Sequence, residues 1–169
     1  REEIKRLQTE LDITFVFVTH DQEEAMSLSD RILVMYQGRI LQAGTPAEIY
    51  ERPANLFIAR FIGGANFLDG VLSNGLGDPV AIETPAGPLT VRTALSGVAS
   101  GERVHVVIRP EAIRLHPDTN GTQPNRLPGR IETATYTGAL VRYTVGVGAT
   151  RLTVDQADPR HSPRFREGD

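Results

Sequence analysis

The sequence predicts a short α/β segment followed by an all-β barrel, and three observations carry this prediction. Residues 13–18 read ITFVFV, a β-branched and aromatic run that is apolar on nearly both faces, as in a strand buried within a parallel sheet. Helix patterns flank this run as far as residue 62. Twelve of the sixteen glycines follow Gly64, where they separate short apolar strands. A boundary is therefore expected within FIGGAN at residues 61–66, where a helix pattern ends at paired glycines.

The elements of the first segment follow from periodicity and capping. Apolar residues at helical spacing predict a helix over residues 4–11. The strand at residues 13–18 comes next, followed by Thr-His-Asp. Asp21 is placed to cap a helix that runs through Met26, and Glu24 completes an acidic variant of the capping box.

A hairpin and two short helices complete this segment. Residues 31–36 and 39–42 flank Gln-Gly, which is a tight hairpin signal. Thr45 is followed by proline and, three residues later, by Glu48, which predicts a capped helix; a second helix is expected at residues 56–62. One buried strand and a hairpin cannot cover both faces of a sheet. Further strands are therefore expected upstream or from another chain.

Short strands separated by Gly, Pro, Asn and Asp dominate the second segment. So many short strands suit a small closed or nearly closed barrel, and a final strand is expected after Asp169. The predicted strands are Phe67–Leu72, Val80–Glu83, Leu89–Arg92, Arg103–Arg109, Ile113–His116, Gly129–Tyr136, Leu140–Val147 and Thr150–Val154.

Composition excludes several classes of protein. The 169 residues carry 18 Lys and Arg against 21 Asp and Glu, a net charge of −3, and no cysteine. Disulfide frameworks, thiolate zinc sites and cysteine nucleophiles are therefore excluded. The sequence contains neither an apolar run of membrane-spanning length nor a secretory signal pattern. The second segment is net neutral and has no basic stripe, which argues against an oligonucleotide-binding barrel.

His20 is the candidate functional residue with a specific context. It follows a strand predicted to be buried and precedes a helix, at the sheet edge where α/β proteins bind ligands. Its imidazole could donate a hydrogen bond to a phosphate oxygen. The alternative is a structural histidine that is satisfied by the local backbone.

Other polar residues have structural interpretations beside functional ones. Glu23 and Glu24 could suggest a metal site, but they suit a solvated face near a helix N-terminus. The remaining histidines share no metal-ligand spacing, so no metal is expected. Glu111 follows Arg-Pro and could belong to a regulatory ligand site or to a rigid turn with an ion pair; the turn is favoured. The helices at residues 45–51 and 56–62 could dock a partner or a regulator, although packing between the two domains is the default.

A longer string resembles a known family. FVFVTHDQEEAMSLSDRI at residues 15–32 is similar to the histidine-loop segment of ATP-binding cassette ATPases of the import group that serves polyamines, sugars and ferric iron. Residues 31–68 resemble the continuation of that P-loop nucleotide-binding domain, and the β-rich half resembles its appended OB-like TOBE barrel. VIRPE at residues 107–111, YTG at 136–138 and VRY at 141–143 look like segments of that barrel.

The resemblance implies a domain for each part of the chain and a role for His20. Residues 1–62 would be the C-terminal remnant of the nucleotide-binding domain, and residues 63–169 a TOBE regulatory domain truncated at its C-terminus. His20 would be the switch histidine that contacts the γ-phosphate of ATP, with ATP and Mg²⁺ used by the intact protein. The sequence holds no GxxxxGK[ST] loop, signature segment or acidic pair before His20. The chain alone is therefore expected neither to bind ATP tightly nor to hydrolyse it.

The resemblance also implies partners. These are a second ATPase subunit in a homodimer, membrane permease subunits and a periplasmic or extracellular solute-binding protein, at the cytoplasmic face of the bacterial inner membrane. GGANFLDG at residues 63–70 favours a polyamine (spermidine or putrescine) importer over ferric iron, sugar or glycerol phosphate. A non-enzymatic dimerisation or ligand-sensing module is the alternative function.

Overall fold

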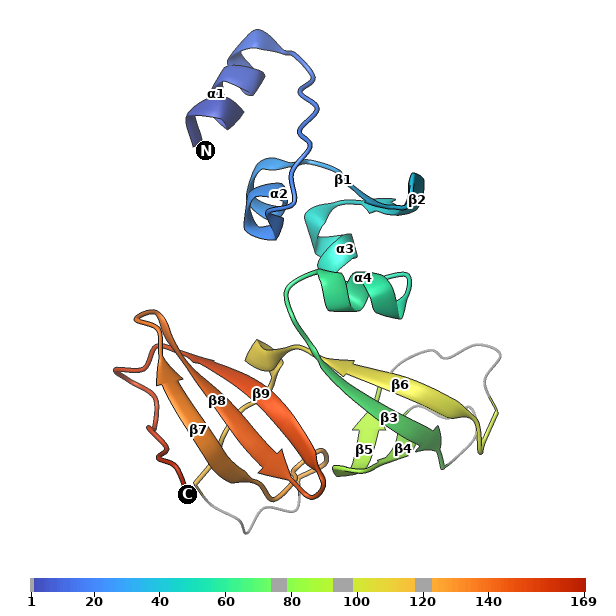
Figure 1. Ribbon diagram of the computed structural model, residues 1–169, viewed down its shortest axis with the longest axis vertical. Coiled ribbons are helices and arrows are strands. Elements are labelled where there is room, and N and C mark those ends of the chain that lie inside the picture. The colour runs from blue at the N-terminus through green and yellow to red at the C-terminus, as the bar shows by residue number, and fades with distance from the viewer. Residues whose placement is uncertain (1, 74–78, 93–98, 118–122) are drawn as a thin grey trace. The chain divides into compact units, whose positions relative to one another are not determined.

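The chain folds as two compact units, Arg1–Gly64 and Ala65–Asp169. The computed structural model describes residues 2–73, 79–92, 99–117 and 123–169 (Figure 1). The two units are described separately below.

Residues 2–64, the described part of the first unit, form four helices and one hairpin. A small apolar core joins the hairpin to the helices that follow residue 20. Ile49 and Ile58 are fully buried in it, and Met26 packs against it. The elements are α1 (Glu2–Leu11), α2 (Gln22–Leu28), β1 (Ile32–Tyr36), β2 (Arg39–Gly44), α3 (Pro46–Glu51) and α4 (Leu56–Phe61).

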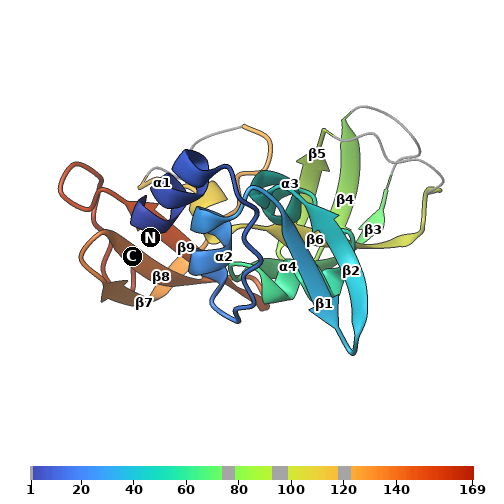
Figure 2. The ribbon, with the colours of Figure 1, turned by 90° about the horizontal axis from the view of Figure 1, so that it is seen from above.

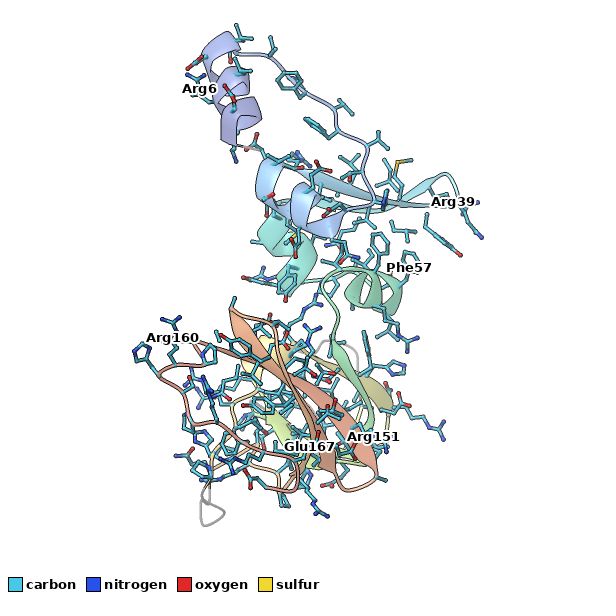
Figure 3. All side chains as sticks on the ribbon, turned by 60° about the vertical axis from the view of Figure 1, so that its left-hand side comes forward. Arg6, Arg39, Phe57, Arg151, Arg160 and Glu167 are labelled. Atoms are coloured by element: carbon cyan, nitrogen blue, oxygen red, sulfur yellow. The ribbon has the colours of Figure 1, made fainter. Side chains whose placement is uncertain are left out.

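Local sequence signals account for the hairpin and for α3. Gln37 and Gly38 both have positive φ, at 48° and 75°, as the predicted two-residue turn requires. β1 and β2 form a separate two-stranded ribbon (Figure 2). At the start of α3 the Thr45 hydroxyl accepts from the Glu48 backbone N–H, and the Glu48 carboxylate accepts from the Thr45 backbone N–H at 2.8 Å. The predicted hairpin and capping box are confirmed.

The capping box makes the stability of this unit depend on pH. The backbone N–H of Thr45, and then its hydroxyl, hold the pKa of Glu48 below its ordinary value. The ionised carboxylate therefore stabilises the fold above the pKa of the unfolded chain, and this contribution is lost as the pH falls through the lower folded pKa. We expect Glu48→Gln to lower the melting temperature at pH 7, with the difference from the natural chain narrowing below about pH 4. Glu51→Gln, in the same helix but outside the box, is the control; equal losses in both variants would contradict the prediction.

The predicted buried strand at residues 13–18 is not observed. These residues run as a single extended trace between α1 and α2, outside any strand (Figure 1). Val16 is 87% and Val18 96% exposed. A strand needs a neighbour for its backbone hydrogen bonds, and within the described residues none pairs with this segment. The sequence prediction identified strand-forming residues, but the neighbours that would bury them are not among the described elements.

The described residues of the second unit, where a closed or nearly closed barrel was predicted, form two antiparallel sheets. The strands pair in the orders β5-β4-β3-β6 and β7-β8-β9, with no ladder joining the two sheets among the described residues. The elements are β3 (Asn66–Leu72), β4 (Val80–Thr84), β5 (Gly87–Val91), β6 (Arg103–Ile108), the 3₁₀ turn η1 (Pro110–Ala112), β7 (Arg130–Tyr136), β8 (Leu140–Val147) and β9 (Thr150–Ala157).

Side chains from both sheets share one core. Leu68 and Leu89 from the first sheet pack in the same cluster as Tyr143 and Val154 from the second. Tyr143 is 1% exposed, and its ring meets Phe165 edge-on at a centroid distance of 6.1 Å. Burial of these apolar side chains holds the two sheets together.

The predicted strand at Ile113–His116 is also wrong. Pro110 opens the turn η1 instead, and the residues that follow have no ladder partner in the described chain. Ile113 and Leu115 nevertheless pack against the core. Their apolar alternation indicated which side chains face inward, whereas pairing of the backbone depends on a neighbouring strand.

One buried polar side chain links the sheets. Asn66 is 7% exposed at the start of β3. Its Nδ2 donates to the carbonyls of Ile108, at the end of β6, and of Thr153, in β9, at 3.3 and 2.8 Å. Its Oδ1 accepts from the Thr153 backbone N–H at 2.7 Å. The amide thereby satisfies backbone groups of both sheets.

Candidate functional site

His20 lies in the short loop between the extended segment and α2, and it is exposed. The residues on either side of it are held by hydrogen bonds. The Asp21 backbone N–H donates to the Thr19 hydroxyl at 3.0 Å, and the Asp21 carboxylate accepts from the Glu24 backbone N–H at 3.0 Å. This fixes the backbone on both sides of the imidazole.

The cap of α2 differs in one respect from the expected box. Asp21 is the N-cap, as predicted. The Asp21 backbone N–H, however, donates to Thr19 rather than to the Glu24 carboxylate. Because the Thr19 hydroxyl accepts from the Asp21 backbone N–H, the hydrogen bonds at the start of the helix involve both neighbours of His20.

The His20 ring is available for a ligand. Within the described part of the chain it makes no hydrogen bond or ion pair, so the local backbone does not satisfy it there. Either ring nitrogen can donate when it carries a proton. Asp21 and Glu23 are exposed beside it. A phosphate at His20 would therefore need additional positive charge or backbone N–H groups from other segments.

The other sequence candidates lie in α2, β6 and η1. Glu23 and Glu24 occupy the first turn of α2. The described residues contain no group of three or more acidic or histidine side chains that could hold a metal ion. His105 pairs with Asp69 at 2.7 Å, on neighbouring strands, and is exposed. Glu111 lies in η1, directly after a buried proline, as expected of a rigid turn.

Gln22 was missed by sequence reasoning. It lies two residues after His20, and its side chain reaches the end of α4. Its Nε2 donates to the Phe61 carbonyl, and its Oε1 accepts from the Gly63 backbone N–H at 2.8 Å. A polar residue in the first turn of a helix gives no signal in a single sequence that it binds backbone about forty positions away.

Comparison with known proteins identifies the second unit first. Residues 106–169 match the family model described as the TOBE domain, which covers most of this unit. The β-rich architecture of two small sheets is consistent with a TOBE or OB-like domain. The chain therefore carries a TOBE domain.

Curated relatives match both units of the chain. The chain is 40% identical over 169 residues to the spermidine/putrescine import ATP-binding protein PotA 1 of Pseudomonas aeruginosa, covering 100% of this chain and 45% of that protein. It is 49% identical over 146 residues to PotA of Oleidesulfovibrio alaskensis, covering 85% and 38%, and 41% identical over 169 residues to PotA of Ruegeria pomeroyi, covering 99% and 44%. The resemblance to ATP-binding cassette import proteins with a TOBE domain is confirmed.

The chain spans less than half the length of these relatives. Among the described residues, no helix combines the length and apolar character needed to cross a membrane.

Proposed function

We propose that the intact protein is the ATP-hydrolysing subunit of a polyamine import system, and that this chain supplies its histidine-loop region and its TOBE domain. The observation that carries the proposal is the similarity of both units, over the whole chain, to spermidine/putrescine import ATP-binding proteins. The assignment covers residues 1–62 as the end of the nucleotide-binding domain and residues 63–169 as the regulatory domain.

His20 is the residue of this chain that contacts the γ-phosphate of ATP in the proposal. Phosphoryl transfer depends on positioning and charge stabilisation, which an imidazole N–H aimed at the phosphate can supply in part. Its exposure, and the hydrogen bonds that fix Thr19 and Asp21 on either side, support this role. A loop held at both flanks can present the ring at a reproducible position.

The residues present fit only one part of a nucleotide site. His20 can donate to a phosphate oxygen, whereas the sequence has no GxxxxGK[ST] loop to cradle phosphates and no acidic pair for Mg²⁺ and the attacking water. Those parts belong to other segments of the intact protein in the proposal. The 169-residue chain alone is expected to show no ATP turnover.

The exposed apolar run at residues 13–18 supports the α/β assignment. Val16 and Val18 are almost fully exposed here, although such residues bury well between parallel strands. In the proposal, the other strands of a P-loop nucleotide-binding domain pair with this segment. His20 then stands at the carboxyl edge of that sheet, where α/β proteins bind their ligands.

The proposed partners follow from import coupled to ATP hydrolysis. They are a second copy of the subunit, permease subunits in the membrane and a solute-binding protein outside it. The subunit would sit at the cytoplasmic face of the membrane, held there by the permease.

Reconstituted transport tests the proposal. Vesicles holding the permease, with the intact subunit inside and the solute-binding protein outside, are expected to take up spermidine or putrescine only with ATP and Mg²⁺ inside. Uptake of ferric iron, a sugar or glycerol phosphate in place of polyamine would overturn the assignment of polyamine as the transported substrate. Absence of ATP hydrolysis by the intact protein would instead favour a non-enzymatic dimerisation or ligand-sensing module.

A further inference from the structure

We infer that Gln22 is a positioning residue that couples the loop carrying His20 to the junction between the two units. Its side-chain amide makes two hydrogen bonds to the chain that leaves the first unit. It donates to the Phe61 carbonyl and accepts from the Gly63 backbone N–H at 2.8 Å. The two hydrogen bonds are observed in the structure. Only the expected effect of nucleotide on them rests on the proposed function.

Gln22 binds one carbonyl of the last turn of α4 and one N–H just beyond that helix. α4 ends at Phe61, so the Phe61 carbonyl lies among the last carbonyls that intrahelical bonds cannot satisfy. Gly63 has φ of +73°, a left-handed backbone conformation that glycine adopts without strain. By binding both groups, Gln22 fixes the direction in which the chain leaves α4.

Close packing restricts this exit further. A Cβ at Gly63 would lie 2.6 Å from Cε2 of Tyr50, in α3. Gly63 therefore contacts α3 while its N–H contacts α2. Asn66, three residues later, is bonded to β6 and β9 of the second unit. Only Gly64 and Ala65 separate the anchor of the first unit from the anchor of the second.

Gln22 also shares a rigid element with His20. It is the first residue of α2, directly after the cap Asp21, whose carboxylate and carbonyl accept from Glu24 and Ala25. A displacement of the loop at His20 therefore moves the start of α2 and, through the Gln22 amide, Phe61 and Gly63. The result is a mechanical path from the proposed γ-phosphate contact to the junction.

Gln42 provides a matched control. Its amide makes the same kind of two-bond clamp, donating to the Arg52 carbonyl at 3.0 Å and accepting from the Ala54 N–H at 2.8 Å. This clamp holds the connection between α3 and α4, not the junction. Replacing Gln42 removes equivalent bonds from the same unit, so it controls for a general loss of stability.

Amide hydrogen exchange in the intact protein tests whether the hydrogen bonds of Gln22 hold Phe61 and Gly63 in place. Without nucleotide, Gln22→Ala is expected to accelerate exchange of the Gly63 amide about tenfold, and Gln42→Ala less than twofold. Gln22→Glu keeps the acceptor for Gly63 but, when ionised, cannot donate to Phe61, so it should give an intermediate rate. Equal acceleration at Gly63 in Gln22→Ala and Gln42→Ala, or none in Gln22→Ala, would overturn the inference.

A nucleotide series tests the coupling. A non-hydrolysable ATP analogue is expected to change Gly63 exchange at least threefold relative to ADP in the natural protein, and to leave it unchanged in Gln22→Ala, with binding measured separately. Bound analogue without any change at Gly63 would overturn the coupling. Failure of the nucleotide to bind at all would overturn the proposed function, while the nucleotide-free comparison would still decide whether Gln22 holds the junction.

Discussion

His20→Ala is expected to lower ATP hydrolysis by the intact protein by about 100-fold, since removal of one preorganised donor at a transition state costs on the order of 10²–10³ in rate. The His20 ring is the group of this chain assigned to the γ-phosphate. The fold should persist because the ring is exposed and the capping bonds of Thr19 and Asp21 do not involve it. Steady-state turnover at saturating ATP, with circular dichroism on the same samples, measures both expectations.

A second histidine provides the control. His116 is also exposed but lies in the second unit and has no assigned role. His116→Ala should leave turnover within about twofold of the natural protein, as a surface substitution away from special features does. If His20→Ala retained more than a third of the natural turnover, His20 would be a structural residue at the start of α2 and not a phosphate contact.

The elements that sequence predicted correctly are those governed by neighbouring residues. The Gln37-Gly38 turn, the Thr45–Glu48 box and the Asp21 cap each depend on positions within three residues of one another. Turn and cap chemistry is local, because a side chain or a positive φ serves the adjacent backbone. A single sequence contains all the information that such features need.

The predicted strands that the structure does not show depend on distant partners. Residues 13–18 have strand-forming side chains, yet a strand exists only where another backbone pairs with it. Ile113–His116 alternates like a strand and packs inward, but Pro110 directs the chain into a turn beforehand. Strand spacing likewise does not tell which strands are neighbours in the two sheets.

Three side-chain amides organise the structure without any local signal. Gln22, Gln42 and Asn66 each bind both a carbonyl and an N–H of the backbone. The partners lie 39 and 41 residues from Gln22, 10 and 12 residues from Gln42, and 42 and 87 residues from Asn66. An amide suits this role because it carries a donor and an acceptor on one rigid group. Their partners become apparent only in the folded chain, so this part of the site was not predictable.

Asn66→Ala is expected to lower the free energy of unfolding of the second unit by about 3 kcal/mol, because each buried polar group left unsatisfied costs about 1–3 kcal/mol. The substitution removes the partner of the Thr153 N–H and carbonyl and of the Ile108 carbonyl. Urea unfolding followed through the NMR signals of β8 and β9 amides reports on this unit alone. Asn66→Asp should also destabilise it, since an ionised carboxylate cannot donate to the two carbonyls.

Asn125 offers the matched comparison for the loss of unfolding free energy expected in Asn66→Ala. Its side chain also binds one residue twice, accepting from the Thr90 N–H at 2.6 Å and donating to the Thr90 carbonyl at 2.8 Å, but these bonds are exposed. Because Asn125 has φ of 63°, glycine removes the side chain without backbone strain. Asn125→Gly should cost less than about 1 kcal/mol, since water can replace exposed hydrogen bonds. If Asn66→Ala cost no more than Asn125→Gly, apolar packing alone would hold the two sheets together, and Asn66 would not anchor the chain where it enters the second unit.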